Sequence, residues 1–404
     1  MFRMSQPLPP LRMNLDFMPS PVEDRPGLLI RDSFQYSDAT LIIPPVLVQC
    51  LQCFDGKQTA LDLREMLVRL TGELDVGQIQ QHLADTLSAA GFLEDEAHEQ
   101  MKAERQRAFA ESPLREPLHA GVAYPDEREE LQRTLAEYMT GGSLVAPDDL
   151  IGIAAPHVSP YGGWETYRAA YSALGPQYKD RTFVILGTSH YGEPEKFGLT
   201  RKRFVTPLGE AVTDLDLLEK LAAEPAANME DYCHSIEHSI EFQVLFLQHI
   251  YGPDVRILPL LCGSYANSIY RGGAPESNDQ VNRFLGRLGE IAAKESERLI
   301  WVLGIDMAHM GQRYGDEMNA YADRAEMLDV AERDRQRIER VNAGDAKGFW
   351  ELVQQNHDDL KWCGSSPLYT FLKVNPGARG STRGYQQWNI DECSVVSFGA
   401  ISFT

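Results

Sequence analysis

Residues 181–190, RTFVILGTSH, decide the fold of this chain. The run is apolar from Phe183 to Leu186, shows no polar alternation, and ends at a histidine. Short runs of this kind are typical of strands that are buried on both faces. The same pattern recurs in DLIGIAAPH (149–157), VRILPLLCG (255–263) and RLIWVLGIDMAH (298–309). The chain is therefore predicted to contain a sheet of buried, mostly parallel strands.

Helical patterns separate these strands. They are WETYRAAYSALG (164–175), DLDLLEKLAAE (214–224), IEFQVLFLQHIYG (240–252) and DQVNRFLGRLGEIAAKE (279–295). Alternating strands and helices indicate an α/β domain whose sheet is covered by helices on both sides. We predict that this domain spans residues 119–404, is mostly helical after residue 316, and closes with the strand CSVVSFGAISF (393–403).

The first part of the chain has a different character. Residues 1–21 are rich in Pro and Met and have no continuous apolar core, so a flexible arm is predicted and not a signal peptide. Residues 22–95 are predicted to form a hairpin with its turn at Ser37–Asp38, followed by three small helices, which is a winged-helix-like plan. Residues 96–118 are predicted to be a linker helix. Cys50 and Cys53 form a C-x-x-C inside a helical pattern, and two buried core cysteines are expected.

Composition narrows the possible partners. The net charge of −21 disfavours nucleic acid and anionic membranes, and residues 22–95 carry more than twice as many acidic as basic side chains. No apolar run reaches the roughly 18 residues of a membrane helix. Six cysteines in 404 residues do not form a disulfide framework, so a cytoplasmic location is expected.

Histidines follow the ends of three predicted strands. They are His157, His190 and His309, the last preceded by Asp306. In open α/β sheets, ligands gather at the carboxyl ends of the strands, so we expect one convergent metal site. Cys363 in KWCGSSPLY is the best further ligand, because the start of a helix favours the thiolate that a metal binds.

A second pattern competes with this site. His234 to His238 is H-x-x-E-H with Glu237, the inverted zinc-protease signature, which would place both histidines on one helical face. That interpretation needs an acidic ligand downstream, for which Glu317 is one of many candidates. It also leaves the histidines at the strand ends unexplained.

Six ordered blocks resemble the Memo-like proteins, whose bacterial members are called AmmeMemoRadiSam system protein B. The blocks are IAAPHVSPYGG, ILGTSHYG, EHSIEFQVLFLQHIYG, GIDMAHMG, WCGSSPLYTFL and SVVSFGAISF. The resemblance implies a fold like that of class III extradiol dioxygenases, which use non-haem Fe(II). It implies metal ligands at His157, His190 and Cys363, with Asp306 and His309 beside the metal and His309 as acid or base.

The same resemblance assigns supporting roles in the site. His238 is predicted to be a catalytic residue together with Asp306 and His309, or to line the pocket. Glu237 and Glu241 would line the pocket or orient a ligand or a metal-binding histidine, and Ser189 and Tyr191 flank His190.

The chain departs from the family pattern at two places and from the dioxygenases at a third. PHVSPYGG is one residue shorter than the usual block, and Gly304-Ile305 replaces the usual Ser-Ser/Thr. Relative to the dioxygenases, Cys363 stands where a carboxylate ligand would be. Two histidines and a cysteine form a softer ligand set, which suits Fe(II), copper or zinc.

Three functions remain open from the sequence. The first is a metal-dependent redox enzyme or accessory factor in a radical-SAM-linked system. The second is a non-enzymatic metal-binding adaptor, and the third is a hydrolase that uses either H-x-x-E-H or a Cys363–His pair. Residues 22–95 resemble PqqD-like domains, which implies a peptide or protein partner bound along the hairpin edge.

Overall fold

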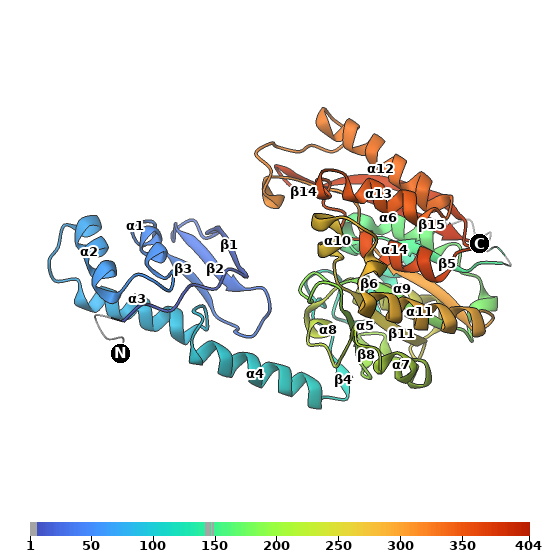
Figure 1. The fold of residues 1–404 in the computed structure, drawn as a ribbon, viewed down its shortest axis with the longest axis horizontal. Helices are drawn as coiled ribbons and strands as arrows, with labels where there is room; N and C mark the ends of the chain where they lie inside the picture. The colour runs from blue at the N-terminus through green and yellow to red at the C-terminus, as the bar shows by residue number, and fades with distance from the viewer. Residues whose placement is uncertain (1–5, 142–146, 148) are drawn as a thin grey trace. The chain divides into compact units, whose positions relative to one another are not determined.

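A computed structural model describes residues 6–141, 147 and 149–404 of the chain. The chain divides into two compact units, Met1–Glu111 and Ser112–Thr404 (Figure 1). Among the described residues, the structure has no helix that is long and apolar enough to cross a membrane.

The first unit is a small sheet covered by helices. Its three antiparallel strands lie in the order β1–β2–β3, where β1 is Leu15–Pro19, β2 is Leu28–Asp32 and β3 is Thr40–Ile43. The helices are α1 (Pro45–Val48), α2 (Ala60–Thr71), α3 (Gly77–Ala89) and α4 (Glu96–Glu111). Cys50 and Cys53 are fully buried in its core, as the sequence predicts.

The prediction of a flexible arm over residues 1–21 is wrong for the described part of that segment. Strand β1 pairs with β2 along its whole length, and Leu8 is buried. Arg12 is also buried, and its guanidinium bonds both carboxylate oxygens of Asp32, at 3.0 and 2.9 Å. The arm therefore supplies an edge strand and half of a buried ion pair, for which its Pro-rich composition gave no signal.

The hairpin turns earlier than predicted. The turn follows β2 directly at Ser33–Phe34, and the Asp32 carboxylate accepts backbone N–H groups from Phe34, Tyr36 and Ser37. Asp32 thus organises the loop that the sequence analysis centred on residues 37–38.

In the part of the chain that the structure describes, the second unit is built on one twelve-stranded sheet. Its main path runs β13–β15–β5–β12–β6–β11–β9–β8–β4, with β5, β12, β6, β11 and β9 parallel. The strands of this path are β4 (Leu114–Arg115), β5 (Gly152–Ala155), β6 (Thr182–Thr188), β8 (Arg203–Thr206), β9 (Gly209–Thr213), β11 (Arg256–Cys262), β12 (Leu299–Gly304), β13 (His309–Gly311) and β15 (Ser394–Phe403). Strand β14 (Gly380–Asp391) pairs with β15, and β7 (Phe197–Leu199) joins β10 (Ala227–Met229) to β11. This is the predicted α/β architecture with a mostly parallel core.

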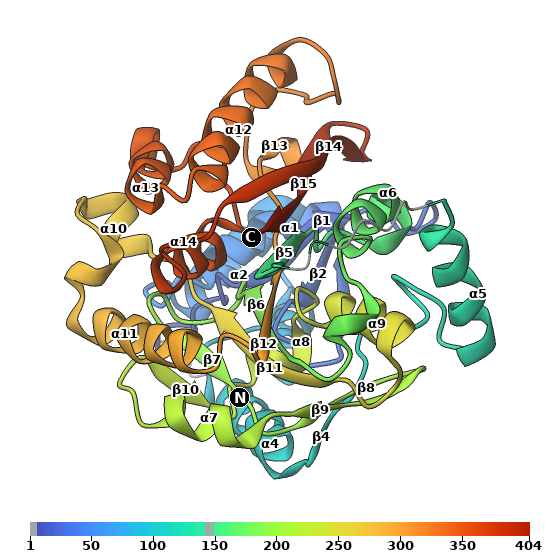
Figure 2. The same ribbon diagram turned by 90° about the vertical axis from the view of Figure 1, so that its right-hand side faces the viewer.

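Helices cover both faces of the sheet (Figure 2). One face packs against α5 (Arg128–Met139), α6 (Pro160–Tyr171) and α9 (Glu241–Tyr251). The other packs against α7 (Leu215–Ala222), α11 (Asp279–Lys294), α12 (Glu326–Asn342), α13 (Ala346–Gln354) and α14 (Ser365–Val374). Two layers of apolar side chains on fully buried strands account for the unbroken apolar runs in the sequence.

Two local features differ from the sequence prediction. Strand β4 pairs with β8, so residues 112–118 belong to the second unit and not to a linker. The helix expected from Glu317 begins only at Glu326, because the backbone N–H groups of Ala322 and Asp323 bond the side chains of Asn389 and Gln387 on β14.

Candidate metal centre

Three adjacent parallel strands end at the same level. Gly304 at the end of β12 pairs with Ala155 of β5 on one side and with Gly187 of β6 on the other. The residues that follow these strands, His157, Asp306 and His190, therefore emerge side by side.

One nitrogen from each of His157 and His190 and the sulfur of Cys363 all lie within 4.8 Å of one another. The His157 Nε2–Cys363 Sγ distance is 3.2 Å, and the centroids of the two imidazole rings are 5.0 Å apart. Residues separated by up to 206 positions in sequence thus meet at one point. The sequence analysis selected these three, and the structure brings them together.

His157 is held with one nitrogen free for a ligand. Its Nδ1 lies 2.9 Å from the carbonyl oxygen of Gly304 and donates to it, so Nε2 is the nitrogen that faces Cys363. The preceding carbonyl of Pro156 accepts from Gln243 Nε2 at 2.8 Å. The ring orientation is therefore set by backbone and buried amide groups.

His190 is oriented by a carboxylate. Glu237 accepts from the backbone N–H of His190 and, at 2.9 Å, from its Nδ1. Burial opposes the charged imidazolium, but Glu237 and the nearby Cys363 sulfur outweigh burial and hold the pKa of His190 well above its usual value. A carboxylate behind an imidazole is the arrangement that commonly supports metal-binding histidines. The His190 side chain remains 28% exposed, so the donor group is open on one side.

Cys363 stands just before α14. Gly364 caps that helix, and its N–H donates to the carbonyl of Asp306 at 3.0 Å. A Cβ on residue 364 would lie 2.7 Å from that carbonyl oxygen, so this close approach of two loops requires glycine. Burial raises the pKa of the Cys363 thiol, but the imidazoles of His157 and His190 outweigh burial and lower it to about 7. The sulfur is therefore readily available as thiolate.

Asp306 and His309 lie beside these donors. Asp306 accepts the backbone N–H groups of His157 and Val158 at 2.9 and 3.2 Å, and its Oδ2 is 3.5 Å from His157 Nε2. Burial raises the pKa of Asp306 to about 6, against the opposing effect of His309. His309 donates from Nδ1 to the carbonyls of Met307 and Lys361, and burial lowers its pKa.

His238 completes a triangle of imidazoles. Its ring centroid is 5.1 Å from that of His157 and 5.0 Å from that of His190. Burial, followed by the neighbouring histidines, holds the pKa of His238 well below its usual value, so the ring is neutral. His119, which the sequence analysis did not select, packs edge-on against His238 at 5.6 Å.

The other predicted supporting residues have different roles. Glu241 is fully buried, and its carboxylate binds Arg115, Tyr124 and the backbone N–H groups of Leu118 and His119. It anchors the segment that carries His119, and none of the hydrogen bonds that it makes within the described part of the chain goes to the side chain of His157 or His190.

Ser189 and Tyr191 flank His190 in different ways. The backbone N–H of Ser189 is bonded to Cys262, which fastens the end of β6 to its neighbour β11. The ring of Tyr191 lies 6.3 Å from that of His190. Of the two, Tyr191 has its ring beside the donor group.

The prediction that the H-x-x-E-H residues form one helix is wrong. Helix α8 is Cys233–Ile236, Glu237 is extended with ψ 141°, and α9 begins at Glu241. His234 and His238 therefore do not share a helical face. His234 is buried and bonds the carbonyl of Gly198 through Nε2 at 3.0 Å, and Glu317 is exposed.

The break between α8 and α9 has a local cause. The chain at Ser239 passes directly over the ends of β6 and β12. A Cβ at Gly304 would lie 2.2 Å from the Ser239 carbonyl oxygen, and one at Gly187 would lie 2.6 Å from its hydroxyl. Glycines at both strand ends thus let Glu237 and His238 reach the site. This close approach explains why glycine occupies position 304.

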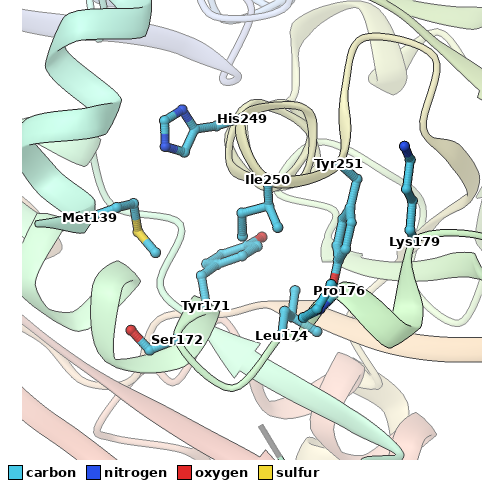
Figure 3. Close-up of a pocket in the computed structure, with 9 residues that line it drawn as sticks. All are labelled: Met139, Tyr171, Ser172, Leu174, Pro176, Lys179, His249, Ile250 and Tyr251. Atoms are coloured by element: carbon cyan, nitrogen blue, oxygen red, sulfur yellow. The ribbon is translucent and has the colours of Figure 1, made fainter. Parts of the chain in front are cut away.

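A separate cavity lies between the ends of α5, α6 and α9 (Figure 3). Its volume is about 330 Å³, and its wall is mostly apolar. The lining residues are Met139, Tyr171, Ser172, Leu174, Pro176, Lys179, His249, Ile250 and Tyr251. None of His157, His190 and Cys363 belongs to this wall, so the cavity is distinct from the candidate metal site.

Comparisons with known proteins agree with the blocks seen in the sequence. A family profile described as "Memo-like protein" matches residues 115–402. A MEMO1 family protein of Aquifex aeolicus is 27% identical, with 86% of each chain covered. MEMO1 family proteins of Desulfurococcus amylolyticus and Pyrococcus abyssi are 26% and 31% identical, covering 72% and 62% of this chain and 98% and 84% of their own. The match to the Aquifex protein covers 86% of this chain, which is more than residues 115–404 contain. The similarity to that protein therefore extends into the first unit.

Proposed function

The chain belongs to the Memo-like protein family, and from this premise we propose that it holds one transition-metal ion on His157, His190 and Cys363. The observation that carries the proposal is the meeting of these three donors within 4.8 Å. Both imidazoles have a hydrogen-bonded Nδ1, which leaves Nε2 as the donor at each.

The donor set fits a borderline or soft ion. Thiolate and imidazole together suit Fe(II), Cu(I) or Zn(II) better than the hard ions that prefer oxygen. Fe(II) is our first choice because of the resemblance to the class III extradiol dioxygenases. A bound iron or copper ion would supply Lewis-acid and one-electron redox chemistry at the open side of the three donors.

The protein groups around that open side handle protons and position a substrate. His238 is neutral and accepts a hydrogen bond from a protic ligand. His309 has its Nδ1 bonded to backbone carbonyls, so its Nε2 is left to accept or return a proton. Asp306 holds the turn after His157. These roles suit a metal-dependent redox enzyme or an accessory factor of a radical-SAM-linked system.

The proposal is tested by metal content. The full chain, purified anaerobically and titrated with Fe(II), Cu(I), Zn(II) and Co(II), is expected to bind one ion. Glu237→Gln should weaken binding by about 10–100-fold, since it removes the carboxylate behind His190. His157→Ala and Cys363→Ser should weaken it further. His82→Ala, an exposed histidine on α3, is the matched control and should bind as wild type.

Two results would overturn the metal site. One is a wild-type chain that takes up no ion under any of these conditions. The other is an ion that stays bound in both His157→Ala and Cys363→Ser.

A second candidate function uses Cys363 as a nucleophile. The 3.2 Å contact between its sulfur and His157 Nε2, just before a helix, is the geometry of an activated thiol. Alkylation of Cys363, measured with and without the ions used in the titrations, separates the two functions. A metal centre predicts that bound ion blocks alkylation of Cys363 by iodoacetamide, whereas a nucleophile predicts fast alkylation in a wild type that binds no ion.

For the first unit we propose a peptide partner that adds a strand to β3. Both β1 and β3 are edge strands of this sheet among the described residues, and β1 pairs with β2, so the outer edge of the β2–β3 hairpin itself is that of β3. An open strand edge binds extended peptides through backbone hydrogen bonds. Peptides selected from a random displayed library on the full chain are expected to slow hydrogen exchange at residues 40–43. Selected peptides that protect only other segments would contradict this binding mode.

A further inference from the structure

We infer that Asp334, a buried carboxylate on α12, is a positioning residue that fixes both loops of the metal centre. The first is the thiol loop, residues 360–364, which carries Cys363. The second is the acid loop, residues 305–309, which carries Asp306 and His309. The inference rests on the metal site proposed above.

Asp334 is hydrogen-bonded to the thiol loop through Trp362. The indole Nε1 donates to Asp334 Oδ1 at 2.6 Å, and Trp362 is the residue before Cys363. The guanidinium carbon of Arg337, one turn along α12, lies 5.3 Å from the centre of the Trp362 ring. Trp362 is only 1% exposed. The tryptophan is therefore held by its edge and by its face, and the backbone that follows it has little freedom.

The other oxygen of the same carboxylate reaches the acid loop through Ser397. Ser397 Oγ donates to Asp334 Oδ2 at 2.6 Å and accepts the backbone N–H of Ala308 at 2.8 Å. The backbone of Ser397 also bonds Met307 and Ala308, at 2.8 and 2.9 Å. Asp334 thereby sets the direction of a hydroxyl on which the acid loop depends.

The two loops also touch each other. The Gly364 N–H donates to the Asp306 carbonyl at 3.0 Å, and the His309 N–H donates to the Leu360 carbonyl at 2.9 Å. His309 Nδ1 lies 3.1 Å from the carbonyl oxygen of Lys361. A displacement of either loop is therefore transmitted to the other, and both are tied to one carboxylate.

The chemistry of the contacts requires a carboxylate at residue 334. Its partners are all donors, namely the Trp362 indole, the Ser397 hydroxyl and the Tyr385 hydroxyl, the last at 2.7 Å from Oδ2. Asp334 has no exposed surface, so water does not replace a lost partner. An asparagine of the same shape would turn an N–H₂ group toward at least one of these donors, and buried donors without an acceptor are strongly unfavourable.

The test compares Asp334→Asn with Asp214→Asn. Asp214 is also a buried carboxylate, 5% exposed, that accepts from Thr182, Leu217 and the Arg298 guanidinium, at the opposite end of β6 from the proposed metal site. Co(II) affinity, the visible spectrum of bound Co(II) and hydrogen exchange of the two loops are measured in both. Asp334→Asn is expected to bind Co(II) about 10–100-fold more weakly, with a shifted spectrum and faster exchange at 305–309 and 360–364. Asp214→Asn should keep the wild-type affinity and spectrum, even where its melting temperature falls.

A double-mutant cycle identifies the route. Trp362→Phe removes the indole donor, so adding Asp334→Asn to it should have a smaller effect on Co(II) affinity than in the wild-type background. Wild-type affinity and spectrum in Asp334→Asn, or equal losses in both Asp→Asn variants, would overturn the positioning role. A wild type that binds no Co(II) would instead overturn the metal site. In that case the hydrogen-exchange comparison alone decides whether Asp334 holds the two loops.

Discussion

Replacing Arg115 by methionine is expected to lower the free energy of unfolding of the second unit by about 3–5 kcal/mol, the usual result of removing one partner of a buried ion pair. The side chains of Arg115 and Glu241 both have no exposed surface. Methionine fills much of the same volume but leaves the Glu241 carboxylate without its counter-charge. Urea unfolding of the full chain, followed by tryptophan fluorescence, measures the change.

The same substitution should also disturb the proposed metal site. Arg115 Nε and Nη2 donate to the backbone carbonyls of His234 and Glu237, both at 2.7 Å. Without these bonds the chain at Glu237 is less constrained, and the carboxylate behind His190 is less well placed. Arg203→Met is the matched control, because Arg203 lies on β8 in an ion pair that is about half exposed and is expected to contribute no more than about 1 kcal/mol. Equal, small losses of unfolding free energy in Arg115→Met and Arg203→Met would show that the buried ion pair does not stabilise the second unit more than a surface pair does.

Acid is expected to destabilise the second unit through His234, by up to about 3 kcal/mol between pH 6.5 and pH 4. Burial lowers the pKa of His234 to about 4, although Asp231 opposes that shift. An unfolded histidine takes a proton near pH 6.5, so over this range the unfolded chain binds a proton that the folded chain excludes. Stability is thus fully present above pH 6.5 and is lost as the pH falls toward 4.

His234→Gln isolates this contribution. Glutamine keeps an N–H donor for the Gly198 carbonyl but has no titrating ring. The unfolding free energy of the variant should depend less steeply on pH than that of wild type over this interval, with His82→Gln as the exposed control. Parallel pH profiles for wild type and His234→Gln would mean that His234 is not a buried neutral ring. If the proposed ion binds at His157, His190 and Cys363, the variant should bind it as wild type does, because His234 lies outside that group.

The sequence predicted the parts of the fold that depend on local pattern. Unbroken apolar runs identified β5, β6, β11 and β12, and the residues after three of those strands included both donor histidines. Cys363 was selected for its place before a helix, and its sulfur does lie near both histidines, while its role as a ligand stays a prediction. Interactions that depend on tertiary packing were missed. Arg115 was assigned to a linker, and nothing in the neighbouring sequence indicates that its guanidinium donates to the backbone carbonyl of Glu237.

The H-x-x-E-H pattern failed for a related reason. Its spacing suits a helix, but the two strand-end glycines draw the chain at Ser239 against the sheet, and that contact interrupts the helix. The flexible arm was mispredicted because strand β1 depends on a partner, β2, and on the distant carboxylate of Asp32. Pattern analysis is strongest where the signal lies within one element and weakest where two elements meet.

The pairing of β15 with β5 has a consequence for biosynthesis. Strand β5 carries the His157 loop, yet one of its edges is completed by Ile401, Ser402 and Phe403, nearly 250 positions later. Such distant pairings form late, because a long segment must be ordered before they can close. A nascent polypeptide whose residues 401–403 have not yet been synthesised would therefore lack one edge of the strand that carries the His157 loop. If the proposed ion binds at this site, we expect it to bind the complete donor group only after β15 has paired with β5.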